Sequence, residues 1–219
     1  MTATTARGPI KALVVVTYIA MVAVNYLANA LPLNGRRTGD VSDAYPSLFT
    51  PAGLTFSIWG VIYLLLALHV LYQLGLFRGG ERSADRDALL NRVGLLFSIS
   101  SLANTAWVFA WHYDIIPLSA VLIVVILVCL ILINNTLRAA GLTGRERWLI
   151  GVPFSVYFGW TTVATIANIT VLLVSLHWNG FGLSESTWAT IIVVVGMLIG
   201  TATMLRNRDV AYGLVLIWA

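Results

Sequence analysis

Tryptophan and asparagine side chains inside long apolar runs are the residues in this sequence most suited to binding a ligand. Trp59, Trp107 and Trp160 each lie well inside such a run, whereas membrane tryptophans usually lie at the headgroup interface. An indole N–H buried in hydrocarbon needs a hydrogen-bond acceptor. At helical spacing, each tryptophan shares a face with other polar or aromatic residues. The stripes are Phe56, Trp59 and Tyr63; Asn104, Trp107 and Trp111; and Trp160, Ala164 and Asn168, with Tyr157 on a neighbouring face.

Two interpretations of these stripes stay open on the residues alone. In the first they only hold helices together, because asparagine side chains bridge membrane helices for roughly 1 kcal/mol each and aromatic rings fill bundle cores. In the second they converge on one pocket, where indole faces supply affinity and a few amides orient a flat ligand. Tyr18, Asn25 and Asn29 add a fourth stripe on the first apolar run. The interpretations differ on whether the stripes meet around a shared cavity.

Ionisable residues are nearly absent from the apolar runs. His69 lies deep in one of them, where a lone histidine can relay protons, bind haem iron or pack with a hydrogen bond. Packing is favoured because the pattern offers no second ligand. His112 and His177 fall at helix ends, where we expect them to be interfacial. No Asp or Glu lies within the first six runs, and no His or Cys group has the spacing of a metal site. We therefore expect no metal site and no catalytic residue, and an enzyme ranks last among the functions.

Seven apolar runs must position these side chains. The chain has 219 residues, of which 59% are hydrophobic and only 10% charged, a composition typical of a polytopic membrane protein. We expect an all-α bundle with the spans Ala12–Leu31, Pro51–Phe77, Val93–Trp111, Ile115–Ile133, Trp148–Leu176, Trp188–Leu205 and Val210–Ala219. Pro51 is expected at a helix start and Pro153 at a kink. The last run reaches roughly 15 Å, half the hydrocarbon core, so we expect the sequence to be truncated inside a span.

Basic residues are distributed unevenly between the loops on the two sides of the membrane. Eleven of the 13 fall on the side of the N-terminus, and only Arg36 and Arg37 fall on the other. The eleven are Arg7, Lys11, Arg78, Arg82, Arg86, Arg92, Arg138, Arg145, Arg147, Arg206 and Arg208. Because positively charged loops stay in the cytoplasm, we predict a cytoplasmic N-terminus in the cell membrane. The net charge of +4 therefore indicates orientation and not nucleic-acid binding.

The longest outer loop, residues 32–50, reads PLNGRRTGDVSDAYPSLFT. Its Gly, Asn and Asp residues favour turns, and its apolar residues can pack against the bundle. A long loop of this kind is often a lid over a binding site, and a solvated connector is the alternative. The candidate lid residues are Asp40, Asp43, Tyr45 and Phe49.

The stripes occur in the order of the motifs of a known family. These motif residues are Pro51, Phe56, Trp59 and Tyr63 in the second run, Asn104 and Trp107 in the third, and Pro153-Phe154, Trp160, Ala164 and Asn168 in the fifth. The pattern resembles the translocator protein / tryptophan-rich sensory protein family (TspO/MBR) over roughly residues 10–177. We therefore divide the chain into a five-helix membrane domain, residues 1–177, and additional membrane helices in residues 178–219. The additional helices have no counterpart in a five-helix protein.

The resemblance implies a pocket under the first outer loop that binds a flat hydrophobic molecule, such as a porphyrin, haem or a sterol. It also implies a sensor or translocator. The candidate ligand-binding residues are Phe56, Trp59, Tyr63, Asn104, Trp107, Trp111, Tyr157, Trp160, Ala164 and Asn168. The alternative is a transporter of a small neutral solute built on seven or more helices. The expected partners are the lipid bilayer, the hydrophobic ligand and, through the small residues Gly196 and Gly200, a second copy of the chain.

Overall fold

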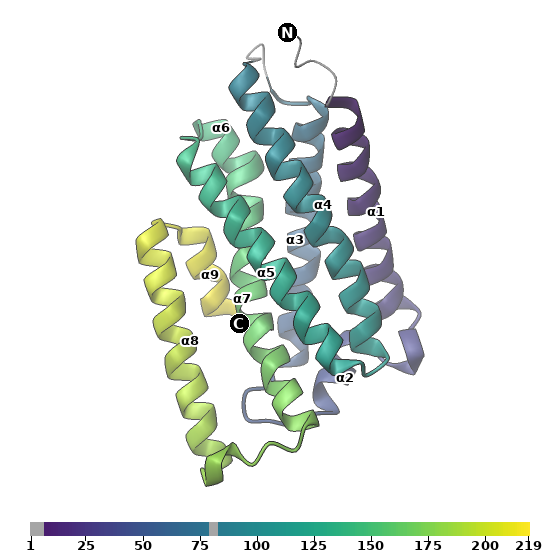
Figure 1. The fold of residues 1–219 in the computed structure, drawn as a ribbon, viewed down its shortest axis with the longest axis vertical. Coiled ribbons are helices and arrows are strands. Elements are labelled where there is room, and N and C mark those ends of the chain that lie inside the picture. The colour runs from purple at the N-terminus through teal and green to yellow at the C-terminus, as the bar shows by residue number, and fades with distance from the viewer. Residues whose placement is uncertain (1–6, 79–82) are drawn as a thin grey trace.

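The computed structural model describes residues 7–78 and 83–219, which form helices and contain no strand (Figure 1). Arg82 lies outside the described residues. The six long helices are α1 (Arg7–Ala30), α3 (Ile58–Leu74), α4 (Ala84–His112), α5 (Ile116–Ala139), α7 (Val152–Ser175) and α8 (Glu185–Asn207). With the short helical turns that precede α3 and α7, each is long and apolar enough to cross a membrane. The prediction of an all-α, multi-pass membrane protein is confirmed.

Shorter helical segments fill the connections between the long helices. These are η1 (Leu33–Gly35), α2 (Thr38–Asp43), η2 (Gly53–Ser57), α6 (Gly144–Glu146), η3 (Arg147–Gly151), η4 (Gly180–Gly182) and α9 (Val210–Trp218). Figure 1 places the start of α1 and α6 at one end of the bundle and α2 at the other. We call these the basic end and the lid end.

Some helices extend past their apolar runs because polar residues cap them. α4 begins at Ala84 rather than at Val93, and the Ser83 side chain caps it by accepting a hydrogen bond from a backbone amide of the first turn. A capping box of Thr143 and Glu146 starts α6, which precedes α7. Caps of this kind satisfy backbone N–H groups that have no partner within the helix. Apolar periodicity therefore locates the spans but not their ends.

Two prolines lie near the starts of the second and fifth spans. Pro51 precedes η2, so the second span begins at Gly53 with a 3-10 turn and Pro51 is outside it. The irregular part of the fifth span is the π-helical segment η3, which ends just before Pro153. A proline ring clashes with the carbonyl four residues earlier, and the wider π turn relieves that clash. The distortion therefore begins before Pro153, and a tilt of this span or a kink at Pro153 stays a prediction.

Five helices form the core of the bundle, and two more flank it. α4 packs between α1 and α5, and α7 packs against α3 and α5. Figure 1 shows α8 and α9 beside α5 and α7, with α8 outermost. The buried residue of α8 is Gly200, and most of its large apolar side chains are exposed. Such a surface suits a helix that faces lipid on most sides.

α9 runs from the basic end back along α7. The two helices approach closely because Gly159 has no side chain: a Cβ there would lie 3.0 Å from both Tyr212 O and Val215 Cβ. The Tyr212 ring packs 4.8 Å from that of Phe158, and its hydroxyl donates to Thr162 Oγ1 over 3.3 Å. α9 is therefore packed tightly against the five-helix core.

The two glycines of α8 pack against helices of this same chain. Gly196 lies against Ile166 of α7, and Gly200 lies against Leu216 of α9. Close helix approach at small residues is the usual basis of packing in membranes. A homodimer through these glycines stays a prediction.

Candidate ligand-binding site

The three intramembrane tryptophans meet in one place. The ring centroid of Trp59 on α3 lies 6.4 Å from that of Trp107 on α4 and 6.0 Å from that of Trp160 on α7. Phe56 of η2 lies 5.8 Å from Trp160, and Trp111 stacks on Trp107 at 5.5 Å. Helical spacing thus brings the three stripes together. We call Phe56, Trp59, Tyr63, Trp107, Trp111, Tyr157 and Trp160 the aromatic cluster.

The rings of this cluster adopt electrostatically favourable geometries. Trp59 meets Trp160 and Tyr157 edge to face, at 85° and 65°, and stacks on Tyr63 at 19°. Offset-stacked and edge-to-face pairs are the arrangements that the ring quadrupole prefers. Trp160 and Tyr157 are 1% and 0% exposed, whereas Trp59 is only half-buried. The α7 side of the cluster is therefore sealed, and the α3 side is more open.

Asparagine hydrogen bonds hold one side of the cluster. Asn25 Nδ2 of α1 donates to Asn104 Oδ1 of α4 over 2.7 Å, and Asn104 Nδ2 donates to the Tyr157 hydroxyl of α7 over 3.4 Å. Tyr18 on α1 donates its hydroxyl proton to Tyr63 O of α3 over 2.8 Å. These bonds join four helices, so the packing interpretation accounts for Asn25 and Asn104.

The donors on the other side of the cluster are unsatisfied. Trp107 Nε1, Trp160 Nε1, Asn168 Nδ2 and the Tyr63 hydroxyl are buried without a hydrogen-bond partner among the described residues. Ser119 Oγ donates to Asn168 Oδ1 over 3.2 Å, so only the NH₂ of that amide is unpaired. An indole nitrogen can only donate, and a buried donor without an acceptor costs about 1–3 kcal/mol. A hydrogen-bond acceptor placed beside these donors would satisfy them.

The space beside these donors is small. A cavity of about 20 Å³ is lined by Ser42, Pro51, Phe56, Trp59, Trp107, Trp111, Trp160, Val163, Ala164, Ala167 and Asn168. This volume holds about one water molecule, whereas sites for larger organic ligands measure about 300–1,000 Å³. Tyr63, Asn104 and Tyr157 are outside its lining. The aromatic side chains occupy the space that a planar ligand would need, so such a ligand enters only when they move.

The outer loop covers the cavity at the end of α4. Trp111 Nε1 donates to Thr38 O over 3.0 Å, and Thr38 Oγ1 lies 3.2 Å from His112 Nε2. Asn34 Nδ2 donates to His112 O over 2.9 Å, and Ser42 lines the cavity itself. His112 is 0% exposed, so the loop and not solvent surrounds it, and its position at the membrane interface stays a prediction. The loop supplies the polar partners that water would supply at an interface.

An ion pair fastens this loop to the turn between α4 and α5. Arg36 pairs with Asp114, whose other carboxylate oxygen accepts a hydrogen bond of 3.1 Å from the Tyr45 hydroxyl. The hydrogen bond to Asp114 raises the pKa of the Arg36 guanidinium. Burial, followed by the contact with Asp114, raises the pKa of the Tyr45 hydroxyl. Because both ion-pair partners are partly exposed, the pair is worth at most about 1 kcal/mol.

The other candidate lid residues, Asp40, Asp43 and Phe49, do not line the cavity. Asp40 accepts a hydrogen bond of 2.8 Å from the Arg37 amide and is exposed, as is Asp43. Phe49 is half-buried and does not line the cavity. The residues of α2 that face the bundle are Thr38, Val41 and Ser42. Sequence reasoning missed these three, although their i, i+3, i+4 spacing is the signal that identifies a buried helix face.

His69 lies apart from this site. It is 0% exposed and packs edge to face against Phe97 and Phe154, with ring centroids 5.3 and 4.7 Å away. Neither ring nitrogen has a hydrogen-bond partner among the described residues. No group of three metal-ligating side chains occurs in residues 7–78 and 83–219. His69 therefore packs among aromatic rings, as the packing interpretation holds, without the hydrogen bond expected of it.

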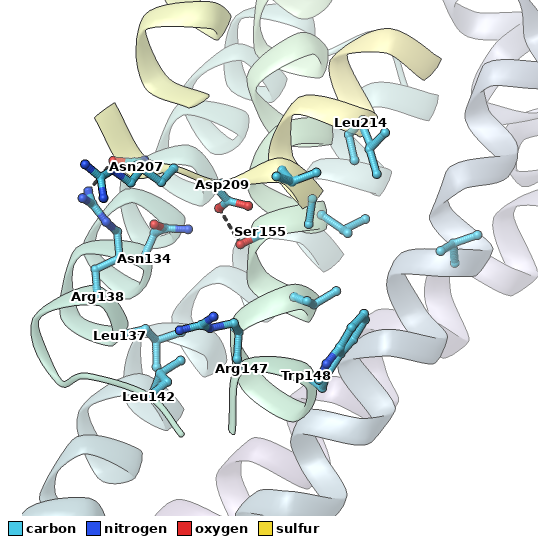
Figure 2. A pocket seen from close by; sticks show the side chains of 18 of the residues that line it. Asn134, Leu137, Arg138, Leu142, Arg147, Trp148, Ser155, Asn207, Asp209 and Leu214 are labelled. Atoms are coloured by element: carbon cyan, nitrogen blue, oxygen red, sulfur yellow. Dashed lines mark hydrogen bonds between the residues drawn. The ribbon is translucent and has the colours of Figure 1, made fainter. Parts of the chain in front are cut away.

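A second and larger cavity, of about 1080 Å³, lies on the side of the bundle where α9 packs (Figure 2). Its walls come from α3, α5, η3, α7, α9 and the turn between α8 and α9. None of the predicted ligand or lid residues lines it. No sequence pattern marks this cavity, because it depends on where α9 packs.

Comparison with known proteins identifies the family of the chain. The family model described as TSPO-like protein matches residues 11–219. No curated protein and no solved structure matches the chain. The family match continues past residue 177 and includes α8 and α9. The resemblance seen in the tryptophan and asparagine motifs is thus confirmed, and the chain belongs to the TSPO-like protein family.

Proposed function

We propose that this membrane protein binds a flat, apolar small molecule with hydrogen-bond acceptors, of the porphyrin type, in the aromatic cluster beneath the outer loop. It would act as a sensor or translocator of that molecule. The observation that carries the proposal is the set of buried donors without acceptors on Trp107, Trp160 and Asn168, beside a cavity that residues from all three stripes line. A site built only for packing has no reason to hold three unpaired donors, because each one costs free energy.

The chemistry of the cluster favours a planar acceptor-bearing ligand. Indole and phenol faces offer dispersion contacts to a flat apolar ring system. The N–H groups of Trp107, Trp160 and Asn168 would donate to carboxylate or carbonyl oxygens at its edge. Hydrogen bonds to a carboxylate are the stronger kind, especially away from water. A tetrapyrrole with acidic side chains combines both properties, and a sterol supplies only one oxygen.

Ligand entry requires the lid and the α3 side of the cluster to move. Phe56 and Trp59 are half-buried and stand at the start of α3, next to the loop. The loop is held mainly by the hydrogen bonds of Thr38 and Asn34 and by the exposed pair of Arg36 and Asp114. Loop segments tied by a few such contacts open locally at low free-energy cost. Opening there exposes the unpaired donors without unfolding the bundle.

Titration with protoporphyrin IX tests the proposal. The shift of the porphyrin absorbance band is the readout, because it does not depend on the number of tryptophan emitters. We expect the double variant Trp59→Phe/Trp160→Phe to weaken binding about tenfold or more. The matched control is Trp148→Phe/Trp178→Phe, in which both residues lie outside the aromatic cluster. Equal affinity in the cluster variant and in the parent protein would contradict the proposal.

Sensing and translocation differ in what happens after binding. A translocator moves protoporphyrin into sealed proteoliposomes, whereas a sensor binds it without net uptake. Uptake is measured with an internal porphyrin acceptor in the vesicle lumen, and the cluster variant is the negative control. This experiment assigns one of the two roles once binding has been established.

A further inference from the structure

The second cavity combines a basic side with an apolar side. Figure 2 shows the polar side chains of Asn134, Arg138, Asn207 and Asp209 together on one side, and Leu214 and Trp148 on the other. With about 1080 Å³, it is as large as the biggest small-molecule sites in proteins. A cavity of this size and polarity at the edge of a membrane bundle requires an amphipathic occupant.

The charges around the cavity are unbalanced. Its lining contains Arg138, Arg147 and Arg208 but a single carboxylate, Asp209. That carboxylate is already engaged: it accepts hydrogen bonds from the Tyr212 amide over 3.0 Å and from a serine hydroxyl over 2.6 Å. Arg138 is held by Asn207 and by Arg206 O. Arg147 and Arg208 make no ion pair with any described residue. The excess positive charge therefore rests on Arg147 and Arg208.

A buried amide in the cavity wall also offers a hydrogen-bond acceptor to a ligand. Asn134 is 5% exposed, lines the cavity, and has an Oδ1 atom without a hydrogen-bond partner among the described residues. An unpaired buried acceptor is costly and becomes satisfied when a donor reaches it. Hydroxyl groups on an anionic headgroup would supply such donors beside the arginines.

The apolar side of the cavity opens towards the membrane. Val61 of α3 and Leu214 of α9 line it, and they are 52% and 61% exposed. Trp148, at 70% exposed, stands on the same side, and exposed tryptophan is typical of the headgroup level of a bilayer. An acyl chain can therefore lie along Val61 and Leu214 while its headgroup reaches the arginines.

We infer that this cavity binds an anionic glycerophospholipid. The phosphate is held between Arg147 and Arg208, because arginine pairs with phosphate through two parallel N–H donors. The headgroup hydroxyls face Asn134, and one acyl chain follows the apolar wall. Charge complementarity favours an anionic lipid at this site. A zwitterionic headgroup would place its own cation next to the arginines, which would repel it. The inference does not depend on the aromatic cluster or its ligand.

Native mass spectrometry of the purified full chain tests this site, with dioleoyl phosphatidylglycerol and dioleoyl phosphatidylcholine as probes. We expect tighter retention of phosphatidylglycerol, by about fivefold for each arginine beside the headgroup, because the choline cation of phosphatidylcholine offsets the charge of the phosphate that both lipids carry. Arg147→Gln should remove about one such factor. Arg208→Gly should do the same while keeping the fold, because Arg208 has a φ of 51°, a conformation that glycine adopts without strain.

Two further variants test whether lipid retention depends on this cavity or only on the positive charge of the whole protein. Arg92→Gln removes an exposed arginine near the basic end that is outside the cavity lining, and it should leave the lipid preference unchanged. Val61→Trp fills the apolar wall and should lower retention of both lipids. Thermal unfolding confirms that each variant is folded. Equal retention of the two lipids by the parent protein, or a loss in Arg92→Gln as large as in Arg147→Gln, would overturn the inference.

Discussion

Replacing Trp160 by phenylalanine separates a packing role from a binding role. Trp160 is 1% exposed, and its Nε1 has no acceptor among the described residues. A smaller ring in this packed core costs about 1–2 kcal/mol, a part of the 3–5 kcal/mol typical of truncation to alanine. Removing a buried unpaired donor returns about 1–3 kcal/mol. The two nearly cancel, so Trp160→Phe should change the free energy of unfolding of the ligand-free protein by less than about 1 kcal/mol.

Ligand binding should respond differently to the same substitution. A hydrogen bond from the indole N–H to a ligand carboxylate is worth about 1.5–3 kcal/mol. The affinity for protoporphyrin should therefore fall roughly 10–100-fold. Both quantities can be measured in one detergent, the first by denaturant unfolding and the second by porphyrin absorbance.

Tyr157→Phe is the matched control, with the opposite signature. The Tyr157 hydroxyl accepts the hydrogen bond from Asn104 Nδ2, so its loss leaves a buried amide donor unpaired. Stability should fall by about 1–2 kcal/mol. Affinity should change by less than about threefold, because the phenyl ring that remains keeps its face in the cluster and the lost hydroxyl already has a partner in Asn104. If Trp160→Phe lost more than about 2 kcal/mol of stability and bound protoporphyrin as tightly as the parent, Trp160 would be a packing residue and the reasoning would be refuted.

Two other predictions concern the helix packing and the lid. Gly159→Ala should destabilise the protein by about 1–3 kcal/mol, since a Cβ there meets Tyr212 O and Val215 Cβ at 3.0 Å. Gly60→Ala, with nothing within 4 Å of the added Cβ, should be neutral or stabilising by about 0.5–1 kcal/mol, and equal thermal unfolding of the two variants would contradict the close approach of α9. Arg36→Gln should speed amide hydrogen exchange in α2 by up to about fivefold at low salt, with little effect at high salt. Exchange that is unchanged at low salt would mean that the ion pair with Asp114 does not hold the lid.

Helical periodicity was sufficient to find the aromatic cluster. Residues three, four and seven positions apart on a helix share a face. Trp59, Trp107 and Trp160 were therefore each assigned to the correct stripe before their helices were placed. The indole N–H and amide groups of the stripes have no hydrogen-bond partner in lipid, which favours their burial within the bundle. The sequence left open whether the asparagines bridge helices or line a pocket, and the bond from Asn25 to Asn104 is a bridge.

Features that depend on how distant segments pack together could not be predicted from the sequence. The unpaired donor on Asn168 follows from the position of Ser119 on a different helix. The burial of His112 follows from the path of a loop. The second cavity arises only because Gly159 lets α9 approach α7 and so brings Asp209 next to Ser155. None of these contacts has a periodic signal, because each joins segments far apart in the chain.

The first turn of α3 separates the two cavities. Phe56 and Trp59 line the cavity of the aromatic cluster, while Ile58 and Val61 line the larger one. Trp218 of α9 also donates its indole N–H to the carbonyl of Thr55 over 3.2 Å. Any displacement of this turn that admits a ligand on one face must therefore move the wall of the other cavity.

This shared turn predicts that the two sites are coupled. A lipid packed against Ile58 and Val61 opposes the displacement of Phe56 that ligand entry requires. Phosphatidylglycerol should therefore weaken protoporphyrin binding, and the reciprocal effect must have the same size, typically about 5–150-fold for coupled sites. Val61→Trp, which puts a bulky side chain permanently on the apolar wall of the larger cavity, should weaken protoporphyrin binding in the same way without added lipid. If saturating phosphatidylglycerol leaves the protoporphyrin affinity unchanged or raises it, the turn does not transmit displacement and the two sites act independently.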